Sequence, residues 1–287
     1  MVSTAGFEFT PRSAIFDFRF DPLDPSLSRR WPHSDGHPGR LLAGRPFMAE
    51  SEIGRMEHTL AATRDLNLIR RTPAYTFGEA AHYLRLPKST LRAWCLGQQQ
   101  FRSIIRLDGK PSEGLSFLNL VEAHVLAAIR RGYGVPMYKV RPALAYVRKE
   151  LGIERPLADA QFETNGLELF TERLGQLVNV SSHGQLAIPQ ILGAYLKRVE
   201  RDARGIPIKL FPFTRKSASG DTSTPVEIDP TVAFGRPVLR SRGVATAVLA
   251  DRFKAGDTLA ELAADYEVAN EEVEEAIRVE LYNRVAA

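Results

Sequence analysis

The stretch YTFGEAAHYLRLPKSTLRAWC, residues 75–95, decides how the first ordered part of the chain folds. Four apolar residues in it recur at i, i+3, i+4 and i+7, which predicts one buried face of a helix: Phe77, Ala80, Ala81 and Leu84. Thr76 and Glu79 stand three residues apart at the start of this helix, the spacing of a capping box. The stretch therefore opens with a short, capped amphipathic helix.

A second short helix follows directly. Pro87 ends the first helix, because proline lacks a backbone donor and restrains the residue before it. Leu91, Trp94 and Cys95 then share one face, which leaves Ser89, Thr90 and Arg92 on the other. Two short helices joined by a tight turn predict a helix-turn-helix, whose second helix enters the major groove of DNA. Alternatively, Ser89 only caps the second helix and the charged residues form a solvated face.

The residues after this pair predict a wing and two longer helices. Residues 103–107 and 115–117 alternate like two strands around a loop, with Arg102, Arg106 and Lys110 beside them. Helices are expected at 119–131, with Asn119 as a cap candidate, and at 137–151. Together, residues 71–151 are predicted to form a winged helix-turn-helix domain. A mixed segment, 152–213, follows, with a helix near 189–202 and a strand at 206–213.

The C-terminal part is set apart by composition. Residues 214–224 are small and polar, as in a linker. Residues 225–287 predict three helices, the first beginning with Val244, Val248 and Leu249. Gly235 and Gly256 are expected where a tight turn and a helix end require positive φ. The fold class is therefore mainly α with small β-hairpins.

Residues 1–70 lack a periodic apolar face and are rich in turn signals, so they are interpreted as a flexible arm. A sharper hypothesis makes the region upstream of Met48 or Met56 a translated leader. His33 and His37 are the one pair of histidines at i, i+4 spacing, but they lie in a segment broken by proline and glycine. A metal site there is not favoured.

Charge is unevenly distributed along the chain. Residues 71–112 hold seven basic and two acidic residues, whereas residues 225–287 hold seven basic and twelve acidic ones. A basic front suits the phosphates of nucleic acid, and an acidic end suits a different partner. The net charge of +4 conceals this difference.

The sequence does not predict an enzyme, a cofactor or a metal. It contains no nucleophile elbow, P-loop or dinucleotide-binding glycine pattern. The single cysteine, Cys95, lies on an apolar helix face, where a small core residue is more typical than a reactive thiol. No apolar run is long enough to span a bilayer, and charged residues interrupt any signal-peptide core, so we expect a cytoplasmic protein.

Residues 74–151 resemble the winged helix-turn-helix of the MerR superfamily, through the run from Ser89 to Trp94. The resemblance implies that Thr90 and Arg92 contact DNA. It departs from that family in having no metal-binding cysteines and no long coiled coil, so it implies no effector sensing. The full set of expected DNA-binding residues is Lys88, Ser89, Thr90, Arg92, Arg102, Arg106 and Lys110.

Residues 225–281 resemble the bacterial domain of unknown function 433, through Gly235-Arg236-Pro237-Val238 and the three-helix pattern. Ser241-Arg242-Gly243-Val244 replaces the usual Gly-Thr-Arg-Ile. The last helix carries five glutamates, which would repel a phosphate backbone: Glu271, Glu272, Glu274, Glu275 and Glu280. This part is expected either to dock a protein partner or to serve as a stabilising or dimerising module.

The combination of these parts resembles an atypical group of VapB-type antitoxins. That resemblance implies a homodimer, or a toxin–antitoxin hetero-oligomer, that binds double-stranded operator DNA, represses its own operon and neutralises a PIN-like ribonuclease toxin. Arg236, Arg240 and Arg242 are expected to reach the acidic site of the toxin, since arginine pairs with carboxylates. The alternatives are a stand-alone MerR-like transcription regulator and a protein-binding adaptor.

Overall fold

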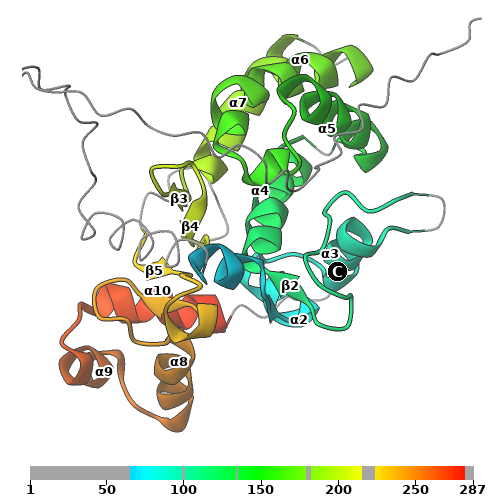
Figure 1. The fold of residues 1–287 in the computed structure, drawn as a ribbon. Coiled ribbons are helices and arrows are strands. Elements are labelled where there is room, and N and C mark those ends of the chain that lie inside the picture. The colour runs from blue at the N-terminus through cyan, green and yellow to red at the C-terminus, as the bar shows by residue number, and fades with distance from the viewer. Residues whose placement is uncertain (1–64, 99–100, 134, 179–181, 215–223, 282–287) are drawn as a thin grey trace, which may run out of the picture. The chain divides into compact units, whose positions relative to one another are not determined.

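The computed structural model describes residues 65–98, 101–133, 135–178, 182–214 and 224–281. The arm up to residue 64, the leader hypothesis and the His33–His37 pair lie outside these ranges, as does most of the predicted linker. The prediction of a flexible arm is wrong for residues 65–70, which are helical, and Arg70 there is buried and lies 3.2 Å from Asp202. The described part is mainly helical with short antiparallel strand pairs (Figure 1), as the sequence predicts.

The N-terminal elements begin with a helical segment at residues 65–71. The following elements are β1 (Pro73–Tyr75), α2 (Phe77–Tyr83), α3 (Lys88–Leu96), β2 (Leu115–Ser116), α4 (Phe117–Tyr133) and α5 (Met137–Leu151). The middle and C-terminal elements are η1 (Pro156–Ala158), η2 (Phe162–Gly166), α6 (Leu167–Val178), α7 (Ser182–Leu196), β3 (Val199–Arg201), β4 (Pro207–Leu210), β5 (Val226–Glu227), η3 (Ala233–Gly235), β6 (Val238–Leu239), α8 (Thr246–Ala255), α9 (Leu259–Tyr266) and α10 (Asn270–Glu280).

Helices α2 and α3 form the predicted pair. Thr76 and Glu79 make the capping box in both directions, and the four predicted apolar residues of α2 are buried. Leu91, Trp94 and Cys95 face the core from α3. The turn between the helices places Arg85 at φ 54°, and the Arg85 guanidinium donates to the carbonyl of Thr214. Pro87 holds the N-cap position of α3, so the alternative role of Ser89 as a cap is wrong.

The predicted wing hairpin is wrong. Residues 103–107 form no strand, and Leu115 pairs with Tyr75 of β1 instead of with a neighbouring strand. Ile105 is fully buried, and its amide donates to the carbonyl of Trp94 at 3.1 Å. The alternation that resembles a strand is therefore a loop that fills the core behind α3.

Helix α4 is the central helix of the described part, with buried residues along nearly its whole length. It begins two residues before the predicted cap. Ser116 caps it, since its hydroxyl accepts from the amide of Asn119 at 3.1 Å, while Asn119 Oδ1 accepts from the Ser116 amide at 3.3 Å. Asn119 thus sits inside the first turn of α4, where its amide group also donates to the carbonyl of Arg106.

The middle segment differs from the prediction at its boundaries. Helix α7 ends at Leu196, not near residue 202, because Val199–Arg201 pair with β4. The strand expected at 206–213 is shorter and ends at Leu210. Leu210 also exchanges two backbone hydrogen bonds with Ile228, at 3.0 and 2.8 Å, which joins the β3–β4 hairpin to the C-terminal unit, residues 225–281.

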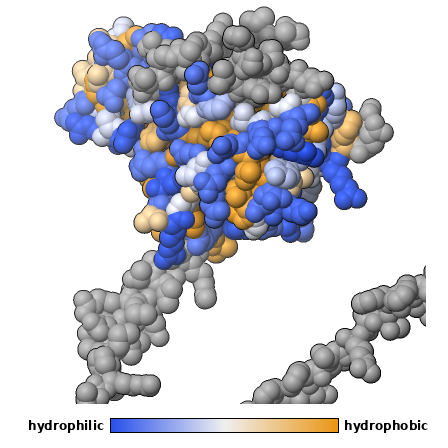
Figure 2. Space-filling model, turned by 90° about the horizontal axis from the view of Figure 1, so that it is seen from above, coloured by the Kyte–Doolittle hydropathy of each residue, from blue (hydrophilic) through white to orange (hydrophobic). Residues whose placement is uncertain are grey.

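The C-terminal unit contains the three predicted helices. Gly256 ends α8 at φ 117° and Gly235 has φ 76°, as expected. Leu249 and Leu262 are buried between the helices, whereas Val248 is 45% exposed. Across the face seen in Figure 2, patches of hydrophobic residues lie between hydrophilic ones.

Candidate nucleic-acid interface

The outer face of α3 carries the residues that sequence reasoning assigns to DNA. Lys88, Ser89 and Arg92 are exposed, and Thr90 is half-buried. No acidic residue lies in the first turn of α3, so the positive end of the helix dipole at the N-terminus of α3 is not neutralised. The Arg92 guanidinium lies 5.3 Å from the centre of the Phe77 ring. A short cationic helix held in this way can approach a phosphate backbone.

A groove of about 780 Å³ adjoins this face. Its walls come from α3, from Gly97, Gln98 and Phe101, from the end of α4 and from the start of α5. They include Ser89, Thr90, Arg92, Phe101, Arg130, Tyr138 and Arg141. The rings are unusually open to solvent: Phe101 is 43% and Tyr138 is 57% exposed. Three arginines and two open aromatic rings therefore line one concave surface.

Each open ring of the groove is paired with a cation. The Arg141 guanidinium lies 5.6 Å from the Phe101 centroid, and Lys139 Nζ lies 5.8 Å from the Tyr138 centroid. Arg141 also donates to the carbonyl of Arg102, which fixes the loop against α5. Such cation–aromatic pairs position charge for phosphates and leave ring faces available for sugars and bases.

The structure does not bring all the predicted residues to this groove. Arg102 adjoins it, through the bond from Arg141 to its carbonyl. Arg106 instead pairs with Glu154 after α5, and the Lys110 amide donates to Glu113 at 2.8 Å. Because there is no hairpin in residues 103–117, Arg106 and Lys110 do not lie on a wing.

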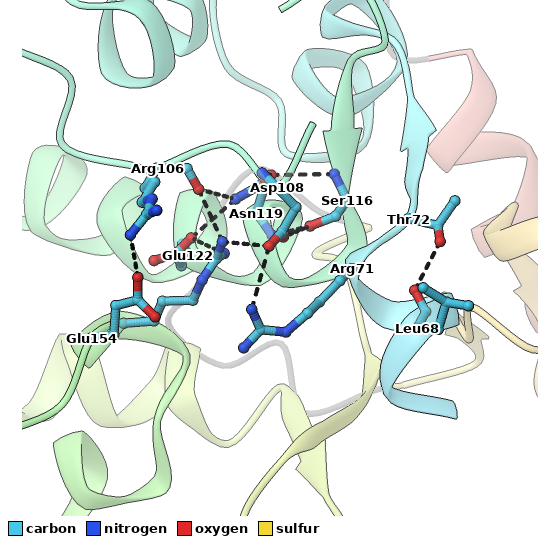
Figure 3. A network of polar contacts seen from close by, with 10 residues as sticks. Leu68, Arg71, Thr72, Arg106, Asp108, Ser116, Asn119, Glu122 and Glu154 are labelled. Carbon is cyan, nitrogen blue, oxygen red and sulfur yellow. Dashed lines mark hydrogen bonds and ion pairs between the residues drawn. The ribbon is translucent and has the colours of Figure 1, made fainter. Parts of the chain in front are cut away.

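A buried ionic cluster fixes the loop that replaces the wing (Figure 3). The Arg155 guanidinium reaches Asp108 at 2.6 Å and Glu122 at 3.1 Å, and all three side chains are at most 10% exposed. Ser116 donates to Asp108 at 2.5 Å, and Asn119 donates to Glu122 at 3.2 Å. This cluster connects the loop to α4 and to the segment after α5.

Glu122 is the carboxylate of this cluster whose charged form is disfavoured by burial. Burial raises the pKa of its carboxyl to about 7, although Arg155 and the Asn119 side chain act in the opposite direction. Asp108 contributes to the rise because two carboxylates share the one buried guanidinium of Arg155. The protonation of Glu122 is therefore coupled to the packing of the loop.

The three C-terminal arginines that were expected to face a toxin have partners within the chain. Arg236 pairs with Glu79 of α2, and Arg242 lies 2.7 Å from Glu267. Arg240 lies 4.0 Å from Glu227 and 5.2 Å from the centroid of Phe211. About half of each arginine side chain remains exposed, at 50%, 53% and 49% for Arg236, Arg240 and Arg242.

The acidic face expected on the last helix is smaller than predicted. Glu275 is buried, with a side chain only 4% exposed, and lies 3.8 Å from Arg278. Glu280 accepts from the Thr246 hydroxyl at 2.5 Å. Glu271 is exposed, and Glu272 and Glu274 are half-buried on the same helix. Glu275 therefore does not join an outward row of five carboxylates.

Sequence reasoning missed Phe101, Arg130 and Tyr138 as part of the interface. It also did not connect Arg141 to α3. The available signal is the pairing of aromatic with basic residues at 101–102 and 138–141. Nothing local to either stretch shows that the two meet.

Within the described ranges, no group of three or more histidine, cysteine, aspartate or glutamate residues could hold a metal ion. A search of the same residues for a helix long and apolar enough to cross a membrane found none.

These features define a helix-turn-helix protein of the DNA-binding class, and one of two matching family models supports that class. Residues 73–144 match the family described as "Putative DNA-binding HTH domain". Residues 226–278 match the family described as "Protein of unknown function (DUF433)".

A curated relative and a solved structure extend the match over most of the chain. The relative, "Putative antitoxin VapB45" from Mycobacterium tuberculosis, is 30% identical over 243 residues, which are 76% of this chain and 98% of the relative. The chain therefore belongs to the VapB45-like antitoxin family. The crystal structure of Rv2018 from Mycobacterium tuberculosis matches with a TM-score of 0.57 and 29% identity, over 71% of this chain and 97% of that one. These similarities point to a non-enzymatic regulator.

Proposed function

We propose that this protein is an antitoxin and autorepressor: it binds the operator DNA of its own operon and neutralises a PIN-like ribonuclease toxin by direct protein contact. The observation that carries the DNA half is the groove beside α3, where Arg92, Arg130 and Arg141 line one concave surface with two open aromatic rings. The toxin half draws its support from the family membership.

In the proposed complex the N-terminal turn of α3 enters the major groove. Lys88 and Ser89 are exposed there and face phosphates or base edges, while Thr90 and Arg92 make the contacts that specify sequence. The rings of Phe101 and Tyr138, with Arg141 over the Phe101 ring, hold the adjoining sugar-phosphate backbone. This second contact replaces the wing that residues 103–117 do not form.

Arg102 remains at the edge of the proposed interface, whereas Arg106 and Lys110 act on phosphates only through long-range attraction. The protein is proposed to act as a homodimer, with half-sites about 34 Å apart, one turn of DNA. Residues 71–151 are the proposed DNA-binding domain. Residues 152–213 follow as a mixed segment of helices and strands, and the C-terminal unit carries the proposed contact with the toxin. Arg236, Arg240 and Arg242 are the proposed cationic groups of that contact.

The test of the DNA half is fluorescence anisotropy with the duplex upstream of the gene and a scrambled duplex of equal length. We expect the upstream duplex to bind at least about a thousandfold more tightly. Arg92→Ala should weaken binding to the upstream duplex more than binding to the scrambled one. Arg204→Ala, in an exposed turn outside the groove, is the matched control. Equal affinity of the wild-type protein for both duplexes would overturn the proposal.

The toxin half is tested by purifying the full chain together with the protein encoded by the adjacent reading frame. A stable complex that lacks ribonuclease activity is expected. A free, active ribonuclease in the presence of excess chain would leave a stand-alone transcription regulator as the function.

A further inference from the structure

Phe234 is an exposed aromatic residue in a backbone conformation that suits glycine. Its side chain is 92% exposed, more than any other large hydrophobic residue in the described ranges. It stands in the centre of η3, where Ala233, Phe234 and Gly235 have φ values of 46°, 55° and 76°. Three consecutive left-handed residues, two of them with a Cβ, form a strained turn.

The turn is held from both sides, so the strain is not relieved by movement. Asp229 accepts from the Thr231 hydroxyl at 2.6 Å and from the Thr231 amide at 2.8 Å. The amide of Gly235 donates to Val232 at 2.8 Å, and that of Arg236 donates to Ala233 at 3.0 Å. A fixed turn therefore presents the Phe234 ring to solvent at a cost in both backbone strain and exposed apolar area.

The basic side chains that follow this turn are more exposed than the carboxylates with which they pair. Arg236 and Arg240 have side chains 50% and 53% exposed, whereas Glu227 and Asp229 of the same segment are only 8% and 13% exposed. A ring with half-exposed guanidinium groups two and six residues further along the chain complements an apolar socket bordered by carboxylates. This local surface is cationic although residues 225–287 as a whole carry more acidic than basic groups.

We propose that Phe234 is the anchor by which this protein docks an acidic protein partner, with its ring inserted in an apolar socket and Arg236 and Arg240 on the carboxylates at the rim. The proposal rests on the proposed function, because the partner it commits to is the ribonuclease toxin. It adds to that function an aromatic contact residue, Phe234, which the pattern of charged residues in the sequence does not indicate.

The test compares three full-length proteins, the wild type, Phe234→Gly and Tyr138→Ala, against the purified protein from the adjacent reading frame. Glycine accepts positive φ, so Phe234→Gly should keep or raise the thermal midpoint while it weakens this binding by about thirtyfold or more. Its affinity for the upstream duplex should not change. Tyr138→Ala removes an exposed ring from the DNA groove. It should weaken binding to the upstream duplex and leave binding to the ribonuclease unchanged.

The outcomes separate the two proposals. If the wild type binds the ribonuclease and Phe234→Gly binds it equally well, the anchor is wrong and the toxin function stands. If the wild type does not bind it, the proposed toxin function fails and the anchor fails with it. If Phe234→Gly instead lowers the mass in light scattering from dimer to monomer and leaves ribonuclease binding intact, the ring contacts a second copy of the chain, which also overturns the proposal.

Discussion

Glu79 and Arg236, 157 residues apart, are joined by an ion pair in which the same carboxylate also caps a helix. One oxygen of Glu79 accepts from the Thr76 amide at 2.9 Å, and the other accepts from Arg236. Partial burial acts to raise the pKa of Glu79, but the hydrogen bonds from Thr76 and Arg236 lower it below its ordinary value. The first helix of the helix-turn-helix and the C-terminal unit thus meet at one carboxylate.

Replacing Glu79 with alanine should destabilise the protein more than replacing Arg236. Glu79→Ala removes the capping box and the ion pair, at a cost of about 1–2 kcal/mol. Arg236→Ala leaves the box intact and removes the half-exposed pair, worth less than about 1 kcal/mol, together with the hydrogen bond to Tyr83. Urea unfolding measures both. Glu261→Ala is the control, because Glu261 makes the same box with Thr258, while nearby Arg252 forms its ion pairs with Asp257 and Asp265. An equal loss for Glu79→Ala and Arg236→Ala would contradict the shared role.

Gly235→Ala should be more harmful than Gly243→Ala, although both glycines have positive φ. A Cβ at Gly243 would meet nothing within 4 Å, so that variant loses only about 1–2 kcal/mol through its backbone. A Cβ at Gly235 would stand 2.3 Å from the Tyr75 hydroxyl. Thermal unfolding should show the difference, and Tyr75→Phe should partly rescue Gly235→Ala by removing that oxygen. A rescue of Gly243→Ala by the same change would argue against the contact.

Glu122 should make the protein less stable as the pH rises. Its pKa is about 7 in the folded state and about 4.5 in the unfolded state, so the folded state binds more protons between these values. The free energy of unfolding should therefore fall across pH 4.5–7, by at most about 3 kcal/mol. Glu122→Gln should flatten this part of the curve measured by urea unfolding. A wild-type curve that rises over the same window relative to the variant would show the opposite sign.

Arg141→Gln should reduce the salt dependence of DNA binding. If its guanidinium neutralises one phosphate, the slope of log affinity against log salt should become shallower by about one unit. Anisotropy titrations from low to moderate salt measure the slope. Arg204→Gln carries the same charge change in an exposed turn and should leave it unaltered. Identical slopes for the wild type and Arg141→Gln would exclude a phosphate contact at this residue.

The Cys95 thiol should be unreactive in the native protein. It is buried at the inner face of α3, and burial raises its pKa to about 12, with a further contribution from Glu122. Thiolate is the reactive form, so labelling with a maleimide should be slow until denaturant is added. Fast labelling under native conditions would show that α3 opens readily.

Local patterns were sufficient where the interaction itself is local. The Thr76–Glu79 box, the inward face of α3 and the glycine at the end of α8 each depend on residues within one or two helical turns. The wing prediction failed because Leu115 found its partner in β1, forty residues earlier, and Ile105 was needed in the core. Periodicity cannot distinguish a strand from a loop that buries the same side chains.

Only part of the candidate interface could be predicted from the sequence, for the same reason. Ser89, Thr90 and Arg92 follow from the helix pattern, but Arg130 and Tyr138 join them only because α4 and α5 bring them alongside α3. Glu275 illustrates the converse in α10, where a charged residue in an acidic run is buried beside Arg278. Composition gives the charge of a segment but not the direction of each side chain.

The paired backbone bonds between Leu210 and Ile228 have a consequence for how this architecture is inherited. They bridge the end of β4 to the residue that follows β5, so a gene fragment that begins at the C-terminal unit encodes Ile228 at an edge without its neighbour. Such an orphaned edge pairs readily with other chains. Recombination that joins this unit to a different DNA-binding domain should therefore carry the hairpin with it. The expected crossover point then lies upstream of Val199 and not within residues 215–223.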